Sequence, residues 1–283
     1  MAIIFDGKEL SKKILGQVKI EIEKLKENGI VPKLAIIMVG DDEASKIYIK
    51  NKSKACNEVG IEYEEYFFDK NITQDELLNT IYKLNERIDI HGILVQCPMP
   101  KQIDEYEIFK TIDYRKDVDG FNPINVGRLQ LNKNTFMPCT AHAILKLLEE
   151  YKIEIEGKHA VIIGRSNIVG KPMLQSLLNK NATVTICHSK TKNIKEITKT
   201  ADILVCAVGK EKFITEDMVK EDAVIIDVGI NRNEKSICGD VDFENVMKKA
   251  AFITPVPGGV GPMTIAMLLK NVVIATRYIT KQK

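Results

Sequence analysis

The chain has 283 residues, of which 45% are hydrophobic and 28% are charged. This composition is typical of a soluble globular protein, and the length allows about one to three domains. The 41 basic and 39 acidic side chains give a net charge of +2, which is too balanced to favour a nucleic acid or a membrane surface as partner. The N-terminus has no signal-peptide pattern and no apolar run reaches the length of a membrane span, so we expect a cytoplasmic protein.

Six cysteines are scattered along the chain, with no C-x-x-C pair and no cluster of cysteine and histidine. Four of them lie in apolar stretches, as buried free cysteines usually do. Disulfides need an oxidising compartment, and nothing in the sequence points to export. The pattern therefore predicts free thiols, mostly in the core, and no metal site.

The first half of the chain alternates helical and strand patterns. The prediction is a helix through Leu10, Ile14, Val18, Ile22 and Leu25, strands at 33–39, 61–68 and 92–96, and helices at 43–59 and 73–88. In the last of these helices, Thr73 and Glu76 have the spacing of a capping box. Alternation of this kind indicates an α/β protein with largely parallel sheets.

Regular patterning stops between residues 113 and 134, and a long irregular stretch in a compact chain tends to be functional. We place a domain boundary there, so that residues 1–120, joined by 263–283, form one domain and residues 121–262 form the other. The second domain is predicted to contain a helix at 140–151, strands at 159–163, 182–187, 202–206, 223–228 and 252–253, and a short helix at 240–248. Residues 255–262 are too rich in proline and glycine for helix or central strand. The final helix, 263–280, has no place in this series, so we expect it to return to the first domain.

Residues 159–178 have the order strand, turn, helix of a phosphate-binding unit. Gly164 ends the strand and Gly170 opens the helix, whose N-terminus can bind an anion through unpaired backbone N–H groups. A P-loop has four residues between its glycines, whereas five intervene here and no hydroxyl residue follows Lys171. A dinucleotide fingerprint has a middle glycine where Ser166 stands. By itself the stretch is therefore also compatible with an ordinary strand–helix turn.

The end of the next strand favours NADP over NAD. An acidic residue there would bind the ribose hydroxyls of NAD, but residues 188–192 read His-Ser-Lys-Thr-Lys, with no acid. Arg165 adds a planar cation suited to the 2′-phosphate. A solvated basic loop is the alternative for this segment alone, but Arg165 and Ser189 coincide about one βαβ unit apart, which favours NADP.

Tyr48 and Lys52 are four residues apart on the predicted helix at 43–59 and therefore share one face. Lysines also stand at positions 46, 50 and 54; like charges and partial burial lower the pKa of a lysine, which would free an amine for proton transfer. Gln96 ends a strand at the edge where ligands bind, and its amide can hydrogen-bond both a ligand and a lysine. A solvated lysine face is the alternative on spacing alone.

Two aspartates, Asp117 and Asp119, lie in the irregular stretch just before Gly120. One of them can form the turn, since aspartate is a common turn residue, and the other can hold a polar group of a substrate. The sequence alone does not decide which aspartate does which.

Seven motifs occur together in this chain, in order. They are Ala44-Ser-Lys-Ile-Tyr48-Ile-Lys-Asn-Lys52-Ser-Lys-Ala-Cys, Gly92-Ile-Leu-Val-Gln96-Cys-Pro-Met-Pro, Lys116-Asp-Val-Asp119-Gly-Phe, Val161-Ile-Ile-Gly-Arg-Ser-Asn-Ile-Val-Gly-Lys-Pro, Cys187-His-Ser-Lys-Thr, Ile226-Asp-Val-Gly-Ile-Asn and Pro255-Val-Pro-Gly-Gly-Val-Gly-Pro-Met-Thr. Over essentially the whole chain, their order and spacing closely resemble the bifunctional methylenetetrahydrofolate dehydrogenase/methenyltetrahydrofolate cyclohydrolase family.

The resemblance implies two αβα domains with a cleft between them, the C-terminal one Rossmann-like, and a final helix that returns to the N-terminal domain. The N-terminal domain would carry the folate chemistry, and the C-terminal domain would bind NADP and form a homodimer. The implied activity oxidises methylenetetrahydrofolate with NADP to the methenyl form, which is then hydrolysed to formyltetrahydrofolate.

The resemblance also implies roles for individual residues. Lys52 would be the central catalytic residue, handling the proton during water attack and ring opening, and Gln96 would hydrogen-bond and tune it. Tyr48 would stack on or orient the folate, and Asp119 would grip the pterin. The implied cofactor residues are Gly164, Arg165, Ser166, Ser189 and Ile230, and the implied borders of the folate site are Pro257, Gly258 and Gly259.

The chain departs from the family pattern at Pro138-Cys-Thr-Ala141-His-Ala143, where the family commonly has Pro-Cys-Thr-Pro-x-Gly. The loss of a proline and a glycine changes the backbone restraint at the start of the connecting helix, which puts the geometry of domain closure in question. Cys97, where leucine is usual, is a mild apolar exchange. The alternatives are a monofunctional methylenetetrahydrofolate dehydrogenase, another two-domain NADP dehydrogenase of the amino-acid or shikimate type, and a nucleotide-sensing binding module, which would need no pairing of Lys52 with Gln96.

Overall fold

A computed structural model describes residues 1–232 and 237–281, and these residues form two compact units. The first, called here the 12–137 unit, also includes the chain from residue 265 onward. The second, called the 138–264 unit, also includes residues 1–11. The chain therefore crosses from one unit to the other three times.

The 12–137 unit is built on a three-stranded parallel sheet with the strand order β3-β2-β4. The central strand, β2 (Lys33–Val39), pairs along its whole length with β3 (Glu62–Phe68) and over four residues with β4 (Gly92–Val95). All of β4 and all but the first residue of β2 are buried, as apolar strands covered on both faces should be. The three predicted strands are therefore confirmed.

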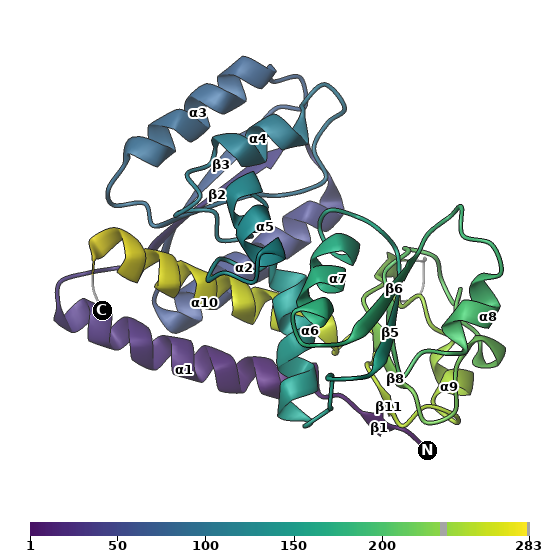
Figure 1. Ribbon diagram of the computed structural model, residues 1–283. Coiled ribbons are helices and arrows are strands. Elements are labelled where there is room, and N and C mark those ends of the chain that lie inside the picture. The colour runs from purple at the N-terminus through teal and green to yellow at the C-terminus, as the bar shows by residue number, and fades with distance from the viewer. Residues whose placement is uncertain (233–236, 282–283) are drawn as a thin grey trace. The chain divides into compact units, whose positions relative to one another are not determined.

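Helices cover both faces of this sheet (Figure 1). α3 (Gln74–Glu86) and α4 (Glu105–Thr111) pack on one face, where their apolar side chains form one core cluster with alternate residues of β2 and β4. α2 (Glu43–Val59) lies on the other face (Figure 1). The predicted capping box of Thr73 with Glu76 is present at the start of α3.

The stretch from 113 to 134, expected to be irregular, contains the helix α5 (Pro123–Gln130). The side chain of Asn122 accepts a hydrogen bond from the backbone N–H of Ile124 at 2.8 Å, which caps the helix. Pro123 occupies the first helical position, where its missing N–H has no cost. The expectation was therefore wrong for these residues, and the Asn-Pro pair is the signal that marks the start of the helix.

The 138–264 unit contains a six-stranded sheet in which every pairing is parallel, in the order β1-β11-β8-β7-β5-β6. Its strands are β1 (Ile3–Ile4), β5 (His159–Ile163), β6 (Thr183–Cys187), β7 (Ile203–Cys206), β8 (Val224–Asp227) and β11 (Phe252–Ile253). β5 lies between β6 and β7, so the strand order reverses there. Such a switch point is where doubly wound sheets bind their ligands.

Short helices and one small hairpin complete this unit. The helices are α6 (Cys139–Glu150), α7 (Gly170–Leu178), α8 (Ile194–Thr198), the 3₁₀ turn Glu216–Met218 and α9 (Phe243–Val246). The hairpin pairs β9 (Asn231–Arg232) with β10 (Ile237–Cys238). These elements agree with the predicted second series, to which the structure adds β9, β10 and the 3₁₀ turn. The helix predicted at 240–248 was wrong for its first residues, because α9 begins at Phe243 and Val241 instead forms a parallel bridge with Ile214.

The first residues of the chain belong to the 138–264 unit because β1 extends its sheet by pairing with β11 (Figure 1). Residues 121–137 belong to the other unit. The compact units therefore divide at 11/12, 137/138 and 264/265, whereas the sequence placed boundaries at 120 and 262. A two-residue strand is too short to show a period, which is why β1 was not predicted.

Two helices, α1 (Gly7–Glu27) and α10 (Val260–Thr280), each begin in the 138–264 unit and end in the 12–137 unit. The return of the final helix is therefore confirmed. α10 begins at Val260 rather than 263, since Pro262 is tolerated in a first turn. It is also long and apolar enough to cross a membrane, which the sequence reading did not expect, but 56% of that stretch is buried inside the protein, as in a core helix.

The six cysteines are free thiols, and Cys56, Cys139, Cys187 and Cys206 are buried, as predicted for four of them. Cys97 and Cys238 are half-buried. Among residues 1–232 and 237–281, no group of three or more histidine, cysteine, aspartate and glutamate side chains is arranged to hold a metal ion.

Candidate active site

Tyr48 and Lys52 stand one turn apart on α2. The carboxylate of Asp42 caps the helix by accepting a hydrogen bond from the backbone N–H of Ser45 at 2.7 Å, and Gly60 ends it in the left-handed conformation. Ile49 and Cys56 are buried on the same helix, whereas Tyr48 and Lys52 are half-buried. The sequence thus makes a well-terminated helix with an anchored side and a side that presents polar groups.

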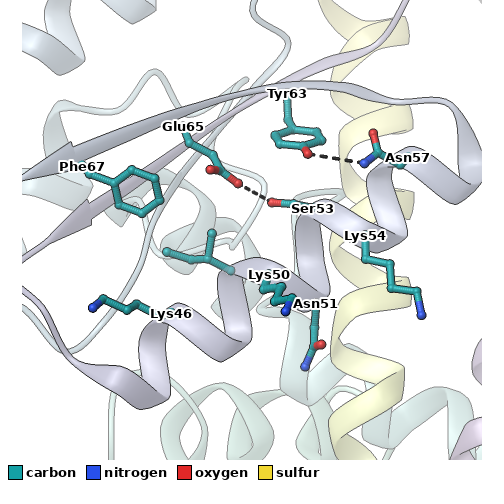
Figure 2. Close-up of a pocket in the computed structure, with 10 residues that line it drawn as sticks. Lys46, Lys50, Asn51, Ser53, Lys54, Asn57, Tyr63, Glu65 and Phe67 are labelled. Atoms are coloured by element: carbon teal, nitrogen blue, oxygen red, sulfur yellow. Dashed lines mark hydrogen bonds between the residues drawn. The ribbon is translucent and has the colours of Figure 1, made fainter.

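A hollow of about 650 Å³ between α2 and β3 shows how α2 is held (Figure 2). Within it, the hydroxyl of Ser53 donates to Oε1 of Glu65 at 2.6 Å, and Nδ2 of Asn57 donates to the hydroxyl of Tyr63 at 3.4 Å. At about 100° per residue, Lys52 lies roughly opposite this hollow on the helix. The contacts with β3 therefore fix the rotation of α2 about its own axis, on the side of the helix that faces away from the candidate catalytic side chains.

Lys52 forms a direct hydrogen bond with Gln96. Its Nζ donates to Oε1 of Gln96 at 2.9 Å, and Nε2 of Gln96 donates to the carbonyl of Cys97 at 2.7 Å. The second bond fixes the orientation of the amide, so the carbonyl oxygen faces the lysine. Gln96 directly follows β4, at the carboxyl end of a parallel strand, where ligands of such sheets bind. The structure therefore brings the two predicted residues together.

Two of the lysines that surround Lys52 on α2, Lys46 and Lys54, have acidic partners. Lys46 pairs with Asp41 and Glu43, and these carboxylates raise its pKa. Lys54 lies 3.9 Å from Glu58. The expected lowering of a lysine pKa by like charges is therefore wrong for Lys46, whose pKa is raised by its two acidic partners.

The structure separates the two aspartates that the sequence left undecided. Asp117 is buried, and its carboxylate accepts hydrogen bonds from the backbone N–H groups of Gly120, Phe121 and Asn122 at 3.1, 3.1 and 2.8 Å. Nδ2 of Asn125 donates to it at 2.7 Å. Asp117 is thus the turn-former, and Asp119, which is half-buried, is the candidate for holding a substrate.

Lys52 and Asp119 both act on the thiol of Cys97, the residue after Gln96. Burial, Glu105 and Asp119 raise the pKa of this thiol to about 12, and Lys52 opposes the rise. Asp117 forms an isolated parallel bridge with Ile93 of β4, so the loop that carries Asp119 runs beside the strand that Gln96 follows. The four predicted residues of this unit, Tyr48 included, therefore come from one helix, one strand end and one loop on the same sheet.

In the 138–264 unit, Gly164 brings the turn after β5 against the end of β7. Its φ of +118° lies in a region that other residues rarely adopt, and a Cβ there would stand 2.2 Å from the carbonyl oxygen of Ala207. The backbone of Gly164 thus lies close to that of Ala207 at the switch point, and a dinucleotide-binding turn needs such a close approach.

Ser166, in place of the middle glycine, closes the turn that leads into α7. Its hydroxyl oxygen accepts from the backbone N–H groups of Val169 at 3.1 Å and Gly170 at 3.4 Å. A serine hydroxyl has two acceptor positions and one donor, so these bonds leave its proton for an external acceptor such as a phosphate. Arg165 is exposed, and no carboxylate of the described residues forms an ion pair with its guanidinium.

Ser189 lies beside this turn along the sheet. β5 and β6 pair in parallel with Ile163 opposite Cys187, and the N–H of Gly164 donates to the carbonyl of Cys187 at 2.9 Å. Arg165 and Ser189 therefore follow neighbouring strands at the same edge, and both are exposed. Their placement is what the predicted binding of a 2′-phosphate needs.

The remaining predicted residues also lie in the 138–264 unit. Ile230 is 43% exposed in the loop after β8. Pro257, Gly258 and Gly259 directly precede α10, and the N–H of Gly259 donates to the carbonyl of Pro255 at 2.9 Å. The implied borders of the folate site are thus carried by the unit that does not contain Lys52.

Comparison with known families agrees with these two arrangements. The catalytic-domain model of tetrahydrofolate dehydrogenase/cyclohydrolase matches residues 5–119, and the NAD(P)-binding-domain model of the same family matches residues 138–280. The chain belongs to the tetrahydrofolate dehydrogenase/cyclohydrolase family. The resemblance and the two-domain α/β fold predicted from the sequence are therefore confirmed.

Individual members of the family match along nearly the whole chain. The bifunctional protein FolD of Bacillus cytotoxicus is 59% identical over 274 residues, which are 96% of each chain. The crystal structure of the bifunctional enzyme FolD from Campylobacter jejuni has a TM-score of 0.97 at 52% identity and covers 98% of this chain and 99% of its own. FolD of Trypanosoma brucei, solved with NADP cofactor and inhibitor, has a TM-score of 0.95 at 36% identity, covering 100% and 99%.

The departure from the usual family sequence at the connecting helix is accommodated within α6. Ala141 and Ala143 are fully buried in its first turns, and alanine is the best helix former. Pro138 precedes the helix without a side-chain cap. The two replacements therefore continue the helix rather than interrupt it.

Three buried charged residues in this family member were not recognised as important from the sequence. Nζ of Lys116 donates to the backbone carbonyls of Leu84, Asn85 and Arg87 at 3.0, 2.8 and 2.6 Å, which completes the C-terminal end of α3. Asp227 and Asp240 hold loops of the 138–264 unit. A charge inside an otherwise apolar run, as in Val-Ile-Ile-Asp at 224–227, is the signal that could have found such a residue.

Proposed function

We propose that this protein oxidises 5,10-methylenetetrahydrofolate with NADP⁺ to 5,10-methenyltetrahydrofolate and hydrolyses the product to 10-formyltetrahydrofolate, as a bifunctional enzyme of one-carbon metabolism. The observation that carries the proposal is the hydrogen bond of Lys52 to Gln96. In the other unit of the same chain, the exposed guanidinium of Arg165 lies at the switch point of the sheet. Membership of the family and the FolD relatives support it.

NADP fits the residues at the switch point. Bound NADP⁺ would supply the acceptor for the hydride of the methylene carbon. Arg165 and Ser189 would hold the 2′-phosphate, while Ser166 and the N-terminus of α7 would face the pyrophosphate. Ile230 would offer an apolar surface to the nicotinamide side. No proton is exchanged in this step, so the 138–264 unit needs binding groups and no general acid or base.

In the hydrolysis, Lys52 would be the residue that accepts the proton of the attacking water. A water oxygen bonds to the cationic methenyl carbon, and the amine of Lys52 takes a proton from that water. The bond from this carbon to the ring nitrogen N5 then breaks, the nitrogen receives one proton, and a second proton is released. Gln96 would hold the amine in position, Asp119 would bind the pterin, and Tyr48 would orient the ring. Pro257, Gly258 and Gly259 would border the folate.

We also propose a cytoplasmic homodimer that associates through the 138–264 units. The balanced charge of the chain and its free thiols support the location. The proposal of a homodimer rests only on the family resemblance, and analytical sedimentation of the purified protein tests it.

A monofunctional methylenetetrahydrofolate dehydrogenase is the alternative, and the contact of Lys52 with Gln96 argues against it. The test is an absorbance assay with methylenetetrahydrofolate and either NADP⁺ or NAD⁺. We expect NADPH and the methenyl form to appear and the methenyl form then to decay faster than in buffer. Methenyl accumulation without accelerated decay would support the alternative, and no reduction of NADP⁺ would overturn the whole proposal.

A further inference from the structure

A pair of buried aspartates lies at the carboxyl end of the 138–264 sheet, outside the residues assigned above. Asp227 ends β8 and is 3% exposed. Its carboxylate accepts from the backbone N–H groups of Gly229, Asp240 and Val241 at 2.9, 3.0 and 2.9 Å. Its own N–H donates to the hydroxyl of the buried Thr254 at 2.7 Å. Asp227 thereby ties the segment containing Asp240 to the end of β8.

Asp240 then holds the loop that follows β7. It is fully buried, and its carboxylate accepts from three consecutive backbone N–H groups, those of Val208, Gly209 and Lys210, at 2.7, 3.0 and 2.8 Å. Nδ2 of Asn231, the first residue of β9 and the one that ends the loop after β8, donates to it at 3.0 Å. One carboxylate therefore joins the loops that leave two neighbouring strands.

The loop after β8 fits tightly around this carboxylate. A Cβ at Gly229 would stand 2.2 Å from Oδ1 of Asp240, so only glycine allows the backbone to pass there. Ile230, the next residue, is the exposed apolar side chain proposed to lie at the nicotinamide. The position of Ile230 is thus set between Gly229 and Asn231, both of which adjoin Asp240.

Both buried carboxylates have their acceptors satisfied by backbone N–H groups. Burial raises the pKa of Asp227 to about 6, although the N–H donors from Asp240, Val241 and Gly229 lower it. A buried charge generally destabilises a protein unless its hydrogen bonds are complete, and here all the bonds given above go to loops at the ligand-binding edge. These hydrogen bonds therefore set the path of the loops at the edge where the sheet would bind its ligand.

We infer that Asp240, itself anchored by Asp227, is a positioning residue for the cofactor: it shapes the two loops after β7 and β8 that receive the nicotinamide half of NADP. Asp240 acts through backbone groups and need not touch the cofactor. The inference rests on the proposed function, because it takes this unit to bind NADP at the carboxyl edge of its sheet.

The substitution Asp240→Asn tests this inference. Asparagine keeps the size of the side chain but turns one acceptor into an N–H₂ group facing backbone N–H donors, which leaves buried donors unpaired. We expect the Kd of the binary complex with NADP⁺, measured by calorimetry without folate, to rise about tenfold or more. The KM for NADP⁺ should rise similarly, and hydrolysis of methenyltetrahydrofolate without NADP⁺ should stay within about twofold of wild type.

Asp202→Asn is the matched control. Asp202 is also an aspartate of this unit whose carboxylate accepts a backbone N–H, that of His159 at 2.9 Å, but it lies at the amino ends of β5 and β7. It should lower the melting temperature and leave the Kd for NADP⁺ unchanged. If Asp240→Asn fails to fold, Asn231→Ala removes only the side-chain donor to Asp240, and we expect its Kd for NADP⁺ to rise about threefold.

The inference is overturned if a folded Asp240→Asn, or Asn231→Ala in its place, binds NADP⁺ as tightly as Asp202→Asn does. It is also overturned if both activities fall together with no change in the Kd. Failure of the proposed function is separate, since it appears in the wild-type protein as absence of turnover with methylenetetrahydrofolate.

Discussion

The two units hold their functional groups by different means. In the 12–137 unit, Tyr48 and Lys52 project from a capped helix of 17 residues, and Gln96 follows a buried strand. In the 138–264 unit, Gly209 and Ile230 lie in short loops whose shape depends on the buried Asp240. Regular elements position one set of residues, and side-chain hydrogen bonds to backbone position the other.

The difference follows from what each part must accommodate. A proton-transferring amine needs one well-placed atom, which a rigid helix provides. A dinucleotide is long and is bound largely through backbone groups at strand ends, so the loops themselves must have a defined path. The expected consequence is that substitutions in the two units affect different measured quantities.

The largest expected effect is that of Lys52→Met. Methionine keeps the apolar length of the side chain and removes the amine, so hydrolysis of methenyltetrahydrofolate should fall about 10²- to 10⁴-fold. The measurement is the decay of methenyl absorbance, with Lys50→Met on the same helix as the control. A decay rate equal to wild type would remove Lys52 from the proton transfer. A rise in the KM for NADP⁺ as large as the loss of hydrolysis would contradict the expectation that substitutions in the two units affect different measured quantities.

Next in size is the change in cofactor preference for Arg165→Ala combined with Ser189→Asp. The change removes the cation for the 2′-phosphate and adds an acceptor for ribose hydroxyls, so we expect the NADP/NAD ratio of kcat/KM to fall about 100-fold. Hydrolysis of the methenyl form should not change. Lys192→Ala, at an exposed lysine of the same basic segment, is the control. An unaltered ratio would show that the 2′-phosphate binds elsewhere.

A smaller effect is expected for Asp117→Asn, which tests whether a loop in the 12–137 unit also depends on a buried carboxylate. Loss of one acceptor in this turn should lower the free energy of unfolding by about 1–3 kcal/mol. The KM for the folate should rise severalfold through Asp119, at unchanged KM for NADP⁺. Urea unfolding and steady-state kinetics measure both quantities. Asp113→Asn, at a carboxylate that pairs with the exposed Arg115, is the control. Equal effects of the two variants would contradict the role of Asp117.

The smallest effect concerns pH and the surface of the same unit. The hydrogen bond from Arg87 is the main cause that lowers the pKa of Glu64 to about 2 from an ordinary value of 4.5. The stabilisation is therefore present above about pH 4.5 and is lost as the pH falls toward 2. Because the Glu64 side chain is 32% exposed, Glu64→Gln should cost less than about 1 kcal/mol at pH 6 and clearly less at pH 2, where about half of the carboxyl groups of the folded protein are protonated. Urea unfolding at the two pH values checks this, and a cost that does not shrink in acid would exclude the ion pair as its source.

Long patterned elements were predictable from the sequence because their residues repeat locally. The buried run of β2, the capped helix α2 and the capping box of α3 all lie where the pattern put them. β1 was not predictable, since two residues show no period and its partner, β11, lies at the other end of the chain. The start of α5 was readable in Asn122-Pro123, but the surrounding polar residues obscured it.

The site residues divide in the same way. The spacing of Tyr48 and Lys52 predicted a shared helix face, but only the folded sheet brings Gln96 to Lys52 across 44 residues. Asp117 and Asp119 look alike in the sequence, and burial alone tells them apart. The bond of Asp240 to Gly209 spans 31 residues, and no local pattern encodes such a contact.

The three N–H groups held by Asp240 have a consequence for how this region can vary among related proteins. A backbone N–H is the same whatever side chain its residue carries, so the path of residues 208–210 is largely independent of the identity of Val208 and Lys210. Lys210 can therefore vary without loss of the loop, whereas Val208 also packs against the core of the unit. The constraint falls instead on Asp240 and on Gly209, and we expect selection to remove substitutions at these two positions.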